Sequence, residues 1–163
     1  MRTCSVVADG ATILFVLIMA LRAIRHIRLS DTPGTATDGI ELAAQERHLR
    51  RKLLVTESGA EILVDLPQSV FIEDGDHLEL DNGTYLEVRA AEEELLEIRG
   101  VSPAHVVQLA WHIGNRHLAA QLEWDRILIL QDRVIALMLE QLGATVKVVR
   151  EQFSPQHGAY HAH

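Results

Sequence analysis

The chain has 163 residues, 48% of them hydrophobic, and this length suits one domain of ordinary size or two small ones. A net charge of −8 argues against a nucleic-acid-binding surface, which needs clustered Lys and Arg. One cysteine excludes an internal disulfide framework, and nine histidines favour imidazole over thiolate as a metal ligand. Composition therefore indicates a reducing compartment, expected to be the cytoplasm, and metal chemistry based on histidine.

Residues 1–22 are interpreted as an N-terminal extension whose origin is open. The apolar run at 11–21 is shorter than the roughly 20 residues that span a bilayer, and arginines follow it where a signal peptide has a small-residue cleavage site. Three interpretations compete: an uncleaved anchor, a buried strand, or sequence upstream of the true start, with Met19 as a plausible beginning. We favour the last, so no membrane association is expected.

Residues 23–90 are predicted to form a small all-β domain. Short runs rich in Val, Ile and Leu alternate with turn sequences that contain glycine. Two hairpins are expected, one joining 49–55 to 61–66 and the other joining 77–80 to 84–88. In the second hairpin, Asn82 and Gly83 predict a tight turn in which both residues take positive φ.

A local basic cluster lies within this first domain, formed by Arg47, Arg50, Arg51 and Lys52. The simpler interpretation is the solvated face of a strand. The functional alternative is a docking surface for an acidic partner.

Residues 91–150 change period and predict two helices among four strands. The strands are expected at 94–99, 120–123, 126–130 and 145–149. The helices are expected at 102–116 and 132–142, with Gly143 ending the second. The order β-α-β-β-α-β is that of the ferredoxin-like fold, so the fold class is α+β, with an all-β domain first. Residues 151–163 show no periodicity and are expected to form a flexible tail.

The side chains of the two helices indicate how each is capped and packed. Ser102 is the expected N-cap of the first helix, with Pro103 at its first position. Its apolar stripe is predicted to be Val106, Leu109, Ala110 and Ile113. For the second helix, the residues at core spacing are predicted to be Val134, Leu137, Met138, Gln141 and Leu142.

The candidate metal-binding residues are His112, His117, His157, His161 and His163, at the end of the first helix and in the tail. Five helical residues turn about 140° beyond a full circle, so His112 and His117 cannot easily bind one ion together. A metal at His117 therefore needs ligands from the tail, or the same residue of a second subunit across a two-fold axis. For His112, a structural role is the simpler interpretation.

The residues carry a resemblance to the UreE family of urease accessory proteins over roughly residues 23–160. It rests on Asp65-Leu66-Pro67, Asp74-Gly75-Asp76, Val88-Arg89-Ala90-Ala91, Pro103-Ala104-His105, His112-Ile113-Gly114-Asn115-Arg116-His117, Phe153-Ser154-Pro155 and Gly158-Ala159-Tyr160. The resemblance implies a peptide-binding-like β domain followed by a ferredoxin-like metal-binding domain. It also implies a homodimer that holds Ni²⁺ as cargo between its subunits, with His117 as the interfacial ligand. The expected partners are the urease accessory GTPase and the urease pre-activation complex.

Two other classes of function are open at this point. A metal-dependent hydrolase is disfavoured, because there is no His-Glu-x-x-His helix, nucleophile elbow or Gly-rich phosphate loop, and no enzyme activity is expected. A protein-binding assembly adapter with incidental histidines is the main alternative. Imidazole also binds Zn²⁺ and Cu²⁺, so the ligands alone do not select nickel.

Overall fold

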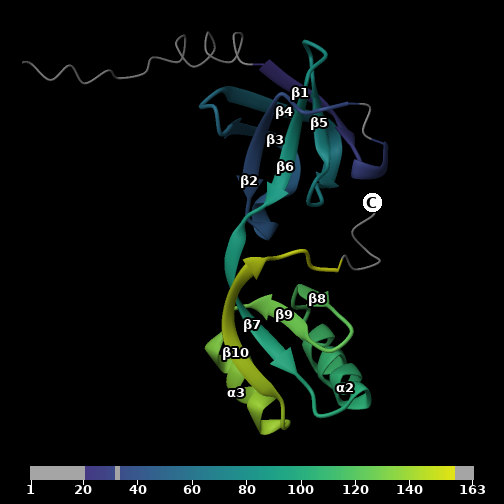
Figure 1. Cartoon of the computed structure of the whole chain (residues 1–163), viewed down its shortest axis with the longest axis vertical. Coiled ribbons are helices and arrows are strands. Elements are labelled where there is room, and N and C mark those ends of the chain that lie inside the picture. Colours follow the sequence, from purple (N-terminus) through teal and green to yellow (C-terminus); the bar gives the residue numbers. More distant parts are fainter. Residues whose placement is uncertain (1–20, 32–33, 157–163) are drawn as a thin grey trace, which may run out of the picture. The chain divides into compact units, whose positions relative to one another are not determined.

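The computed structural model describes residues 21–31 and 34–156, which form two compact units (Figure 1). The first unit comprises the chain up to Glu41 together with His48–Arg89. The second comprises Leu42–Arg47 together with the chain from Ala90 onward. The short segment Leu42–Arg47 thus belongs to the second unit although both of its flanks belong to the first. The three tail histidines, His157, His161 and His163, lie outside the described residues, as do residues 1–20.

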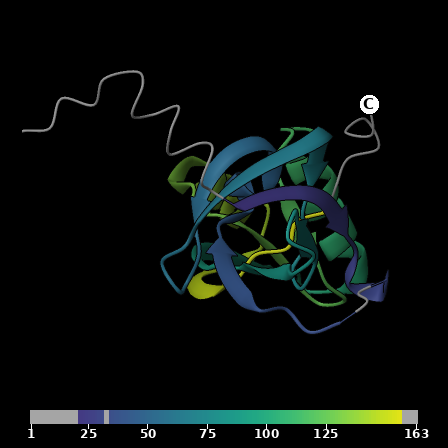
Figure 2. The same ribbon diagram turned by 90° about the horizontal axis from the view of Figure 1, so that it is seen from above.

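The first unit is a six-stranded sheet that curls into a half-barrel (Figure 2). The sheet order is β2-β6-β5-β1-β4-β3, with β1 parallel to β4 and antiparallel to β5. Ala23, Val64 and Leu78, on the central strands, are fully buried in its core. The prediction of an all-β first half is confirmed. Its elements are β1 (Leu21–Ile27), the 3-10 helix η1 (Leu29–Asp31), β2 (Asp38–Leu42), β3 (His48–Val55), β4 (Glu61–Phe71), β5 (His77–Leu80) and β6 (Tyr85–Ala90).

Both predicted hairpins form, and Asn82 and Gly83 lie in the turn of the second, but Asn82 does not take the positive φ expected there. Of the two, only Gly83 has a positive φ, of 83°. The Gly83 N–H donates to the Leu80 carbonyl at 2.9 Å, and the Leu80 N–H donates to the Thr84 carbonyl at 2.9 Å. This is a three-residue loop, in which a type I turn is followed by a left-handed glycine. The Asn82 side chain favours it by accepting hydrogen bonds from the Thr84 N–H and hydroxyl at 3.0 and 2.7 Å.

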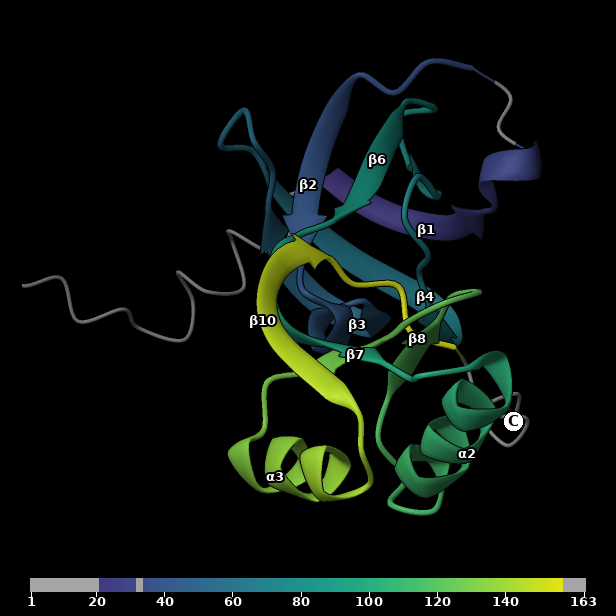
Figure 3. The same cartoon turned by 60° about the horizontal axis from the view of Figure 1, so that its bottom comes forward.

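The second unit has the predicted βαββαβ order. Its elements are β7 (Glu92–Arg99), α2 (Pro103–Gly114), β8 (Ala120–Leu122), β9 (Ile127–Leu130), α3 (Arg133–Gln141) and β10 (Thr145–Gln152), together with the 3-10 helix η2 (Ala44–Glu46). The sheet order is β10-β7-β9-β8 with every pair antiparallel, as in the ferredoxin-like fold. Both helices cover one face of this sheet (Figure 3). In the described part of the chain, no helix has the length and hydrophobicity needed to cross a membrane.

The stripe predicted for the first helix is correct, whereas the one predicted for the second is mostly wrong, because of its residues only Met138 packs against the core. On α2, Leu109 and Ile113 are buried in the core. On α3, Val134 and Leu137 are 73% and 52% exposed, and Leu139 is the buried residue. Six consecutive apolar residues, 134–139, occupy most of α3, so hydrophobicity alone does not fix which face turns inward. The sheet decides it, because Leu139 packs against β7 and β9 residues.

The tail predicted to begin at residue 151 begins later in the structure. Strand β10 continues to Gln152, and Phe153 is fully buried. The Ser154 N–H donates to the Gln121 side-chain oxygen at 2.8 Å, and the Gln156 N–H donates to the Ala120 carbonyl at 2.8 Å. Residues 151–156 are therefore part of the folded unit. Their hydrogen bonds and burial involve residues distant in sequence, which periodicity cannot reveal.

Candidate metal centre

Helix α2 begins with the predicted cap and places the candidate histidines at its far end. The Ser102 side chain accepts a hydrogen bond from the His105 N–H at 3.2 Å, and Pro103 occupies the first helical position. At the other end, the Arg116 N–H donates to the Ile113 carbonyl at 3.0 Å. The Arg116 guanidinium also donates to the His112 carbonyl at 2.8 Å. The helix carbonyls are thus satisfied locally before the chain reaches His117.

His117 terminates this turn in a left-handed conformation. Its φ is 54°, and it is the one non-glycine residue with positive φ in the described ranges 21–31 and 34–156. Its N–H donates to the Gly114 carbonyl at 2.9 Å. Histidine is among the residues that tolerate this conformation. The side chain is exposed, so its imidazole is accessible to a metal ion from solvent.

His112 occupies a different environment on the same helix. It is half-buried, and its ring packs edge-on against the Trp111 indole with 5.0 Å between ring centroids. Among the described residues, no group of three or more His, Cys, Asp or Glu side chains is arranged to hold a metal ion. The structure does not, therefore, join His112 and His117 into a site within the described part of one chain.

The face of α2 that points away from the sheet is apolar and exposed. Val107 and Trp111, one turn apart, are 69% and 66% exposed. Ala104 and Gly114 lie on the same face by helical spacing and are also exposed. A Cβ added at Gly114 would meet no atom within 4 Å. This α2 face leads directly to the turn that carries His117.

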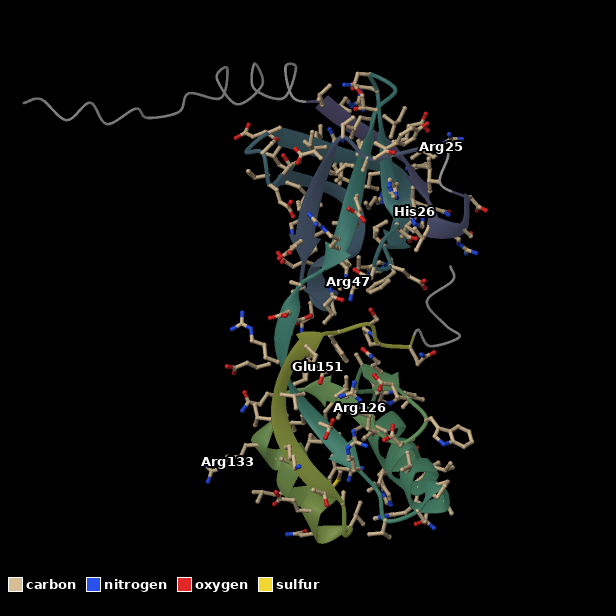
Figure 4. All side chains as sticks on the ribbon, viewed as in Figure 1. Arg25, His26, Arg47, Arg126, Arg133 and Glu151 are labelled. Carbon is tan, nitrogen blue, oxygen red and sulfur yellow. The ribbon has the colours of Figure 1, made fainter. Side chains whose placement is uncertain are left out.

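The opposite face of the sheet carries a dense ion-pair network. Arg126 donates to Glu97 at 2.9 Å, to Glu123 at 2.6 Å and to Glu151 at 2.9 Å (Figure 4). Arg99 also donates to Glu97 at 2.9 Å. The hydrogen bond from Arg99, aided by Arg126, lowers the pKa of Glu97 to about 2 despite the opposing effect of burial. These carboxylates are thus committed to arginines, which makes them poor candidates for metal ligands.

Sequence reasoning missed the residues that fix the chain just before the tail. Arg47 is fully buried, and its guanidinium donates to the Phe153 carbonyl. Phe153 itself packs with Ala44, Leu95 and Leu128. Arg47 stands next to Arg50–Lys52, which are exposed on β3, so nothing in the local pattern marks it as different. A lone aromatic residue after a strand, as at Phe153, was the only available signal.

Comparison with known proteins assigns both halves of the chain. Residues 18–91 match the model of the N-terminal domain of the UreE urease accessory protein, and residues 93–163 match that of its C-terminal domain. A urease accessory protein UreE of Agrobacterium fabrum is 53% identical over 133 residues, which cover 81% of this chain and 83% of the relative. UreE 1 of Brucella suis is 55% identical over 140 residues, covering 85% and 86%.

A further UreE, from Brucella anthropi, is 58% identical over 125 residues, covering 75% of this chain and 74% of the relative. These matches confirm the resemblance on which the sequence interpretation rests. They also confirm, through a family of accessory proteins, that the chain is not an enzyme. The chain belongs to the UreE urease accessory protein family.

Proposed function

We propose that the protein is a nickel metallochaperone whose dimer holds Ni²⁺ between two copies of His117 and delivers it to apo-urease in the cytoplasm. Family membership supports the role in urease maturation. One observation carries the site: His117 is exposed in a left-handed turn at the end of the exposed apolar face of α2. A second copy packed on that face would bring two imidazoles together about a two-fold axis.

The exposed α2 face supports this mode of dimerisation. Val107 and Trp111 present adjacent apolar side chains to solvent, and tryptophan is enriched among residues that dominate interface energies. Gly114 leaves room for close approach of a second backbone at the same end of the helix. If a second copy buried this face, the dimer contact would lie next to His117.

The tail histidines complete the proposed site. Gln156 pairs with Ala120, three residues after His117, and three residues span at most about 11 Å. His157, His161 and His163 follow Gln156 in sequence, and we propose that they supply the remaining ligands. His112, half-buried beside Trp111, would act as support or as an auxiliary ligand.

Delivery then proceeds by ligand exchange and involves no covalent chemistry. A closed cage of four protein ligands suits a structural ion, whereas two imidazoles and a short tail leave positions open for a receiving protein. Proton competition for the imidazole nitrogens weakens binding as pH falls. We propose that the urease accessory GTPase and the urease pre-activation complex receive the ion. Because imidazole also binds Zn²⁺ and Cu²⁺, choice of nickel depends on geometry and on these partners.

The proposal is tested by nickel titration calorimetry combined with light scattering on the full chain. The variants are His117→Asn, which keeps a residue suited to the left-handed turn, and a chain that ends at Gln156. His48→Ala, at an exposed histidine of β3, is the matched control. We expect one tight Ni²⁺ per dimer, lost in His117→Asn, weakened by truncation and unchanged in the control.

Unchanged nickel binding in His117→Asn would move the metal to the tail and favour the adapter alternative, in which the protein assembles the urease complex without specific metal delivery. The adapter would also be favoured if truncation after Gln156 removed nickel binding but left association with the urease proteins intact.

A further inference from the structure

The C-terminal segment of the second unit crosses its sheet from one edge to the other. Strand β10 is one edge strand and β8 is the opposite edge strand, with β7 and β9 between them. Three strand spacings amount to about 14 Å, and four extended residues span about 13–14 Å. Residues 153–156 begin at the end of β10 and finish with Gln156 paired to Ala120 of β8. The segment is thus just long enough for the crossing.

Side chains fasten this crossing segment along its length. Phe153 is fully buried against Leu95 of β7 and Leu128 of β9, the two strands that the segment crosses. Gln121 of β8 accepts the Ser154 N–H at 2.8 Å. The crossing ends beside β8, the strand that follows His117 after two residues. The starting point of the tail is therefore set by folded structure rather than by the end of β10.

Arg47 is the most buried charged group that holds the crossing segment. Its side chain, labelled in Figure 4, is fully buried. It donates to the Phe153 carbonyl, the first carbonyl after β10. It lies in the segment Leu42–Arg47, which belongs to the second unit although its flanks belong to the first. Burying a guanidinium is costly unless it is paired, so the hydrogen bond to the Phe153 carbonyl offsets part of that cost and opposes release of the crossing segment.

From these contacts we infer that Arg47 and Gln121 are positioning residues for metal capture: they hold the crossing segment so that the tail starts beside Ala120, three residues from His117. The inference rests on the proposed function, because it assumes that the tail histidines bind the cargo ion. If the crossing segment were released, the tail would start at Gln152, at the opposite edge of the sheet. Residues 153–156 would then become part of the tail and lengthen it by four residues. The effective concentration of tail imidazoles at His117 would fall accordingly.

The inference is tested by a double-mutant cycle on the full chain. Arg47→Met removes the buried donor, and Gln121→Met removes the acceptor of Ser154 with little risk to the fold, since Gln121 is only half-buried. Each substitution is combined with truncation after Gln156, and Ni²⁺ affinity is measured for every species. Arg150→Met, at an exposed arginine of β10, is the matched control.

Each positioning variant is expected to bind Ni²⁺ about tenfold more weakly than wild type when the tail is present. In the truncated chain the same substitution should cause no further loss, because there is no tail left to position. Amide hydrogen exchange of Ser154 and Gln156 in the metal-free protein should accelerate in both variants and stay unchanged in Arg150→Met. This second measurement reports positioning without any reference to metal.

Equal losses of affinity in full-length and truncated chains would overturn the inference, because they would assign Arg47 and Gln121 a general structural role. Faster exchange of Gln156 with undiminished Ni²⁺ affinity would also overturn it, since the tail would then need no positioning. Failure of the proposed function has a different signature, namely unchanged Ni²⁺ binding in His117→Asn.

Discussion

The two ends of helix α2 carry histidines in opposite environments. At the first turn, His105 uses both ring nitrogens: Nδ1 accepts the Val101 N–H at 3.1 Å, and Nε2 lies 2.9 Å from the Leu142 carbonyl, to which it donates. Beyond the last turn, three residues after Gly114, the ring of His117 makes no hydrogen bond to another described residue and is exposed. One histidine thus joins two parts of the fold, whereas the other is left available for a ligand.

This contrast shows that a histidine's role is decided by what its two nitrogens already bind. His105 lies within the Pro103-Ala104-His105 motif and His117 ends the block that begins at His112, and of these two the resemblance implies a metal-binding role for His117 alone. The hydrogen bonds of His105 supply the physical reason for this difference. Four predictions test or refine the contrast.

The largest expected effect is on the end of α2 that carries His117. Trp111→Glu places a charge on the exposed α2 face and should convert the dimer into a monomer, with Ni²⁺ affinity falling by on the order of 100-fold, or about 2.7 kcal/mol. Analytical ultracentrifugation and nickel titration measure the two effects. Leu53→Glu, a similar change at a 43% exposed leucine of β3, should alter neither. If the Trp111→Glu protein stays dimeric, the exposed α2 face is not the dimer contact, and the proposed metal site does not depend on it.

At the opposite end of α2, His105→Ala should destabilise the fold without affecting the metal. It removes two exposed hydrogen bonds, to the Val101 N–H and the Leu142 carbonyl, each worth about 0.5–1.5 kcal/mol, so the free energy of unfolding should fall by about 1–3 kcal/mol. Urea unfolding measures this loss, with Gln108→Ala at an exposed position of the same helix as control. The contrast between the two ends fails if His105→Ala weakens Ni²⁺ binding as much as His117→Asn does.

The ion pairs of Glu97 predict that acid removes metal before it unfolds the second unit. The pKa of Glu97 is about 2 in the fold against an ordinary value of 4.5, so the stability it contributes is complete above pH 4.5 and is lost as pH falls towards 2. We expect this contribution to be about 1–2 kcal/mol after solvent screening. Imidazole takes up protons at higher pH than carboxylates do, so Ni²⁺ leaves first.

Urea unfolding at pH 7 and pH 3 tests this, with Glu97→Gln as the comparison. The difference in stability between the wild type and Glu97→Gln should shrink on acidification. A difference that is the same at both pH values would show that Glu97 does not titrate as the arginine contacts require.

The smallest effect is expected at Gly114. An added Cβ would meet no atom within 4 Å, so Gly114→Ala should raise the unfolding free energy by about 0.5–1 kcal/mol by favouring the helix. Thermal or urea unfolding of the metal-free protein measures it. If stability rises while the dimer weakens, the glycine serves close approach of the second copy; a fall in monomer stability would contradict the open environment.

The order of elements was predictable, because each rests on local signals. Ser102 caps α2 as predicted, and Asp132, which was predicted as the first residue of the second helix, is the N-cap of α3. The antiparallel strand pairs follow from short alternating runs. The phase of α3 was not predictable, since its apolar residues surround the helix and only the sheet selects Leu139. The backbone conformation at Asn82 was not predictable for a similar reason. Several turn types have similar energies, and the hydrogen bonds of the Asn82 side chain stabilise the one observed.

The site was predictable only in part. His117 could be proposed from a motif, yet its left-handed conformation and exposure required the structure. The role of residues 151–156 was not accessible, because Phe153, Gln121 and Ala120 come together across an entire sheet. Contacts between residues this far apart in the sequence produce no periodic pattern in either of the two segments.

The pairing of Arg47 with Phe153 also has a consequence for how the protein is made. The two residues are 106 positions apart, so Arg47 leaves the ribosome long before the carbonyl that it binds has been synthesised. The first unit has its strands complete by Ala90 and can fold during translation, whereas the second unit has to wait for β10 and the residues beyond it. A chain released before Phe153 would leave a buried guanidinium without that partner, and it would be an early substrate for proteases rather than an incomplete chaperone.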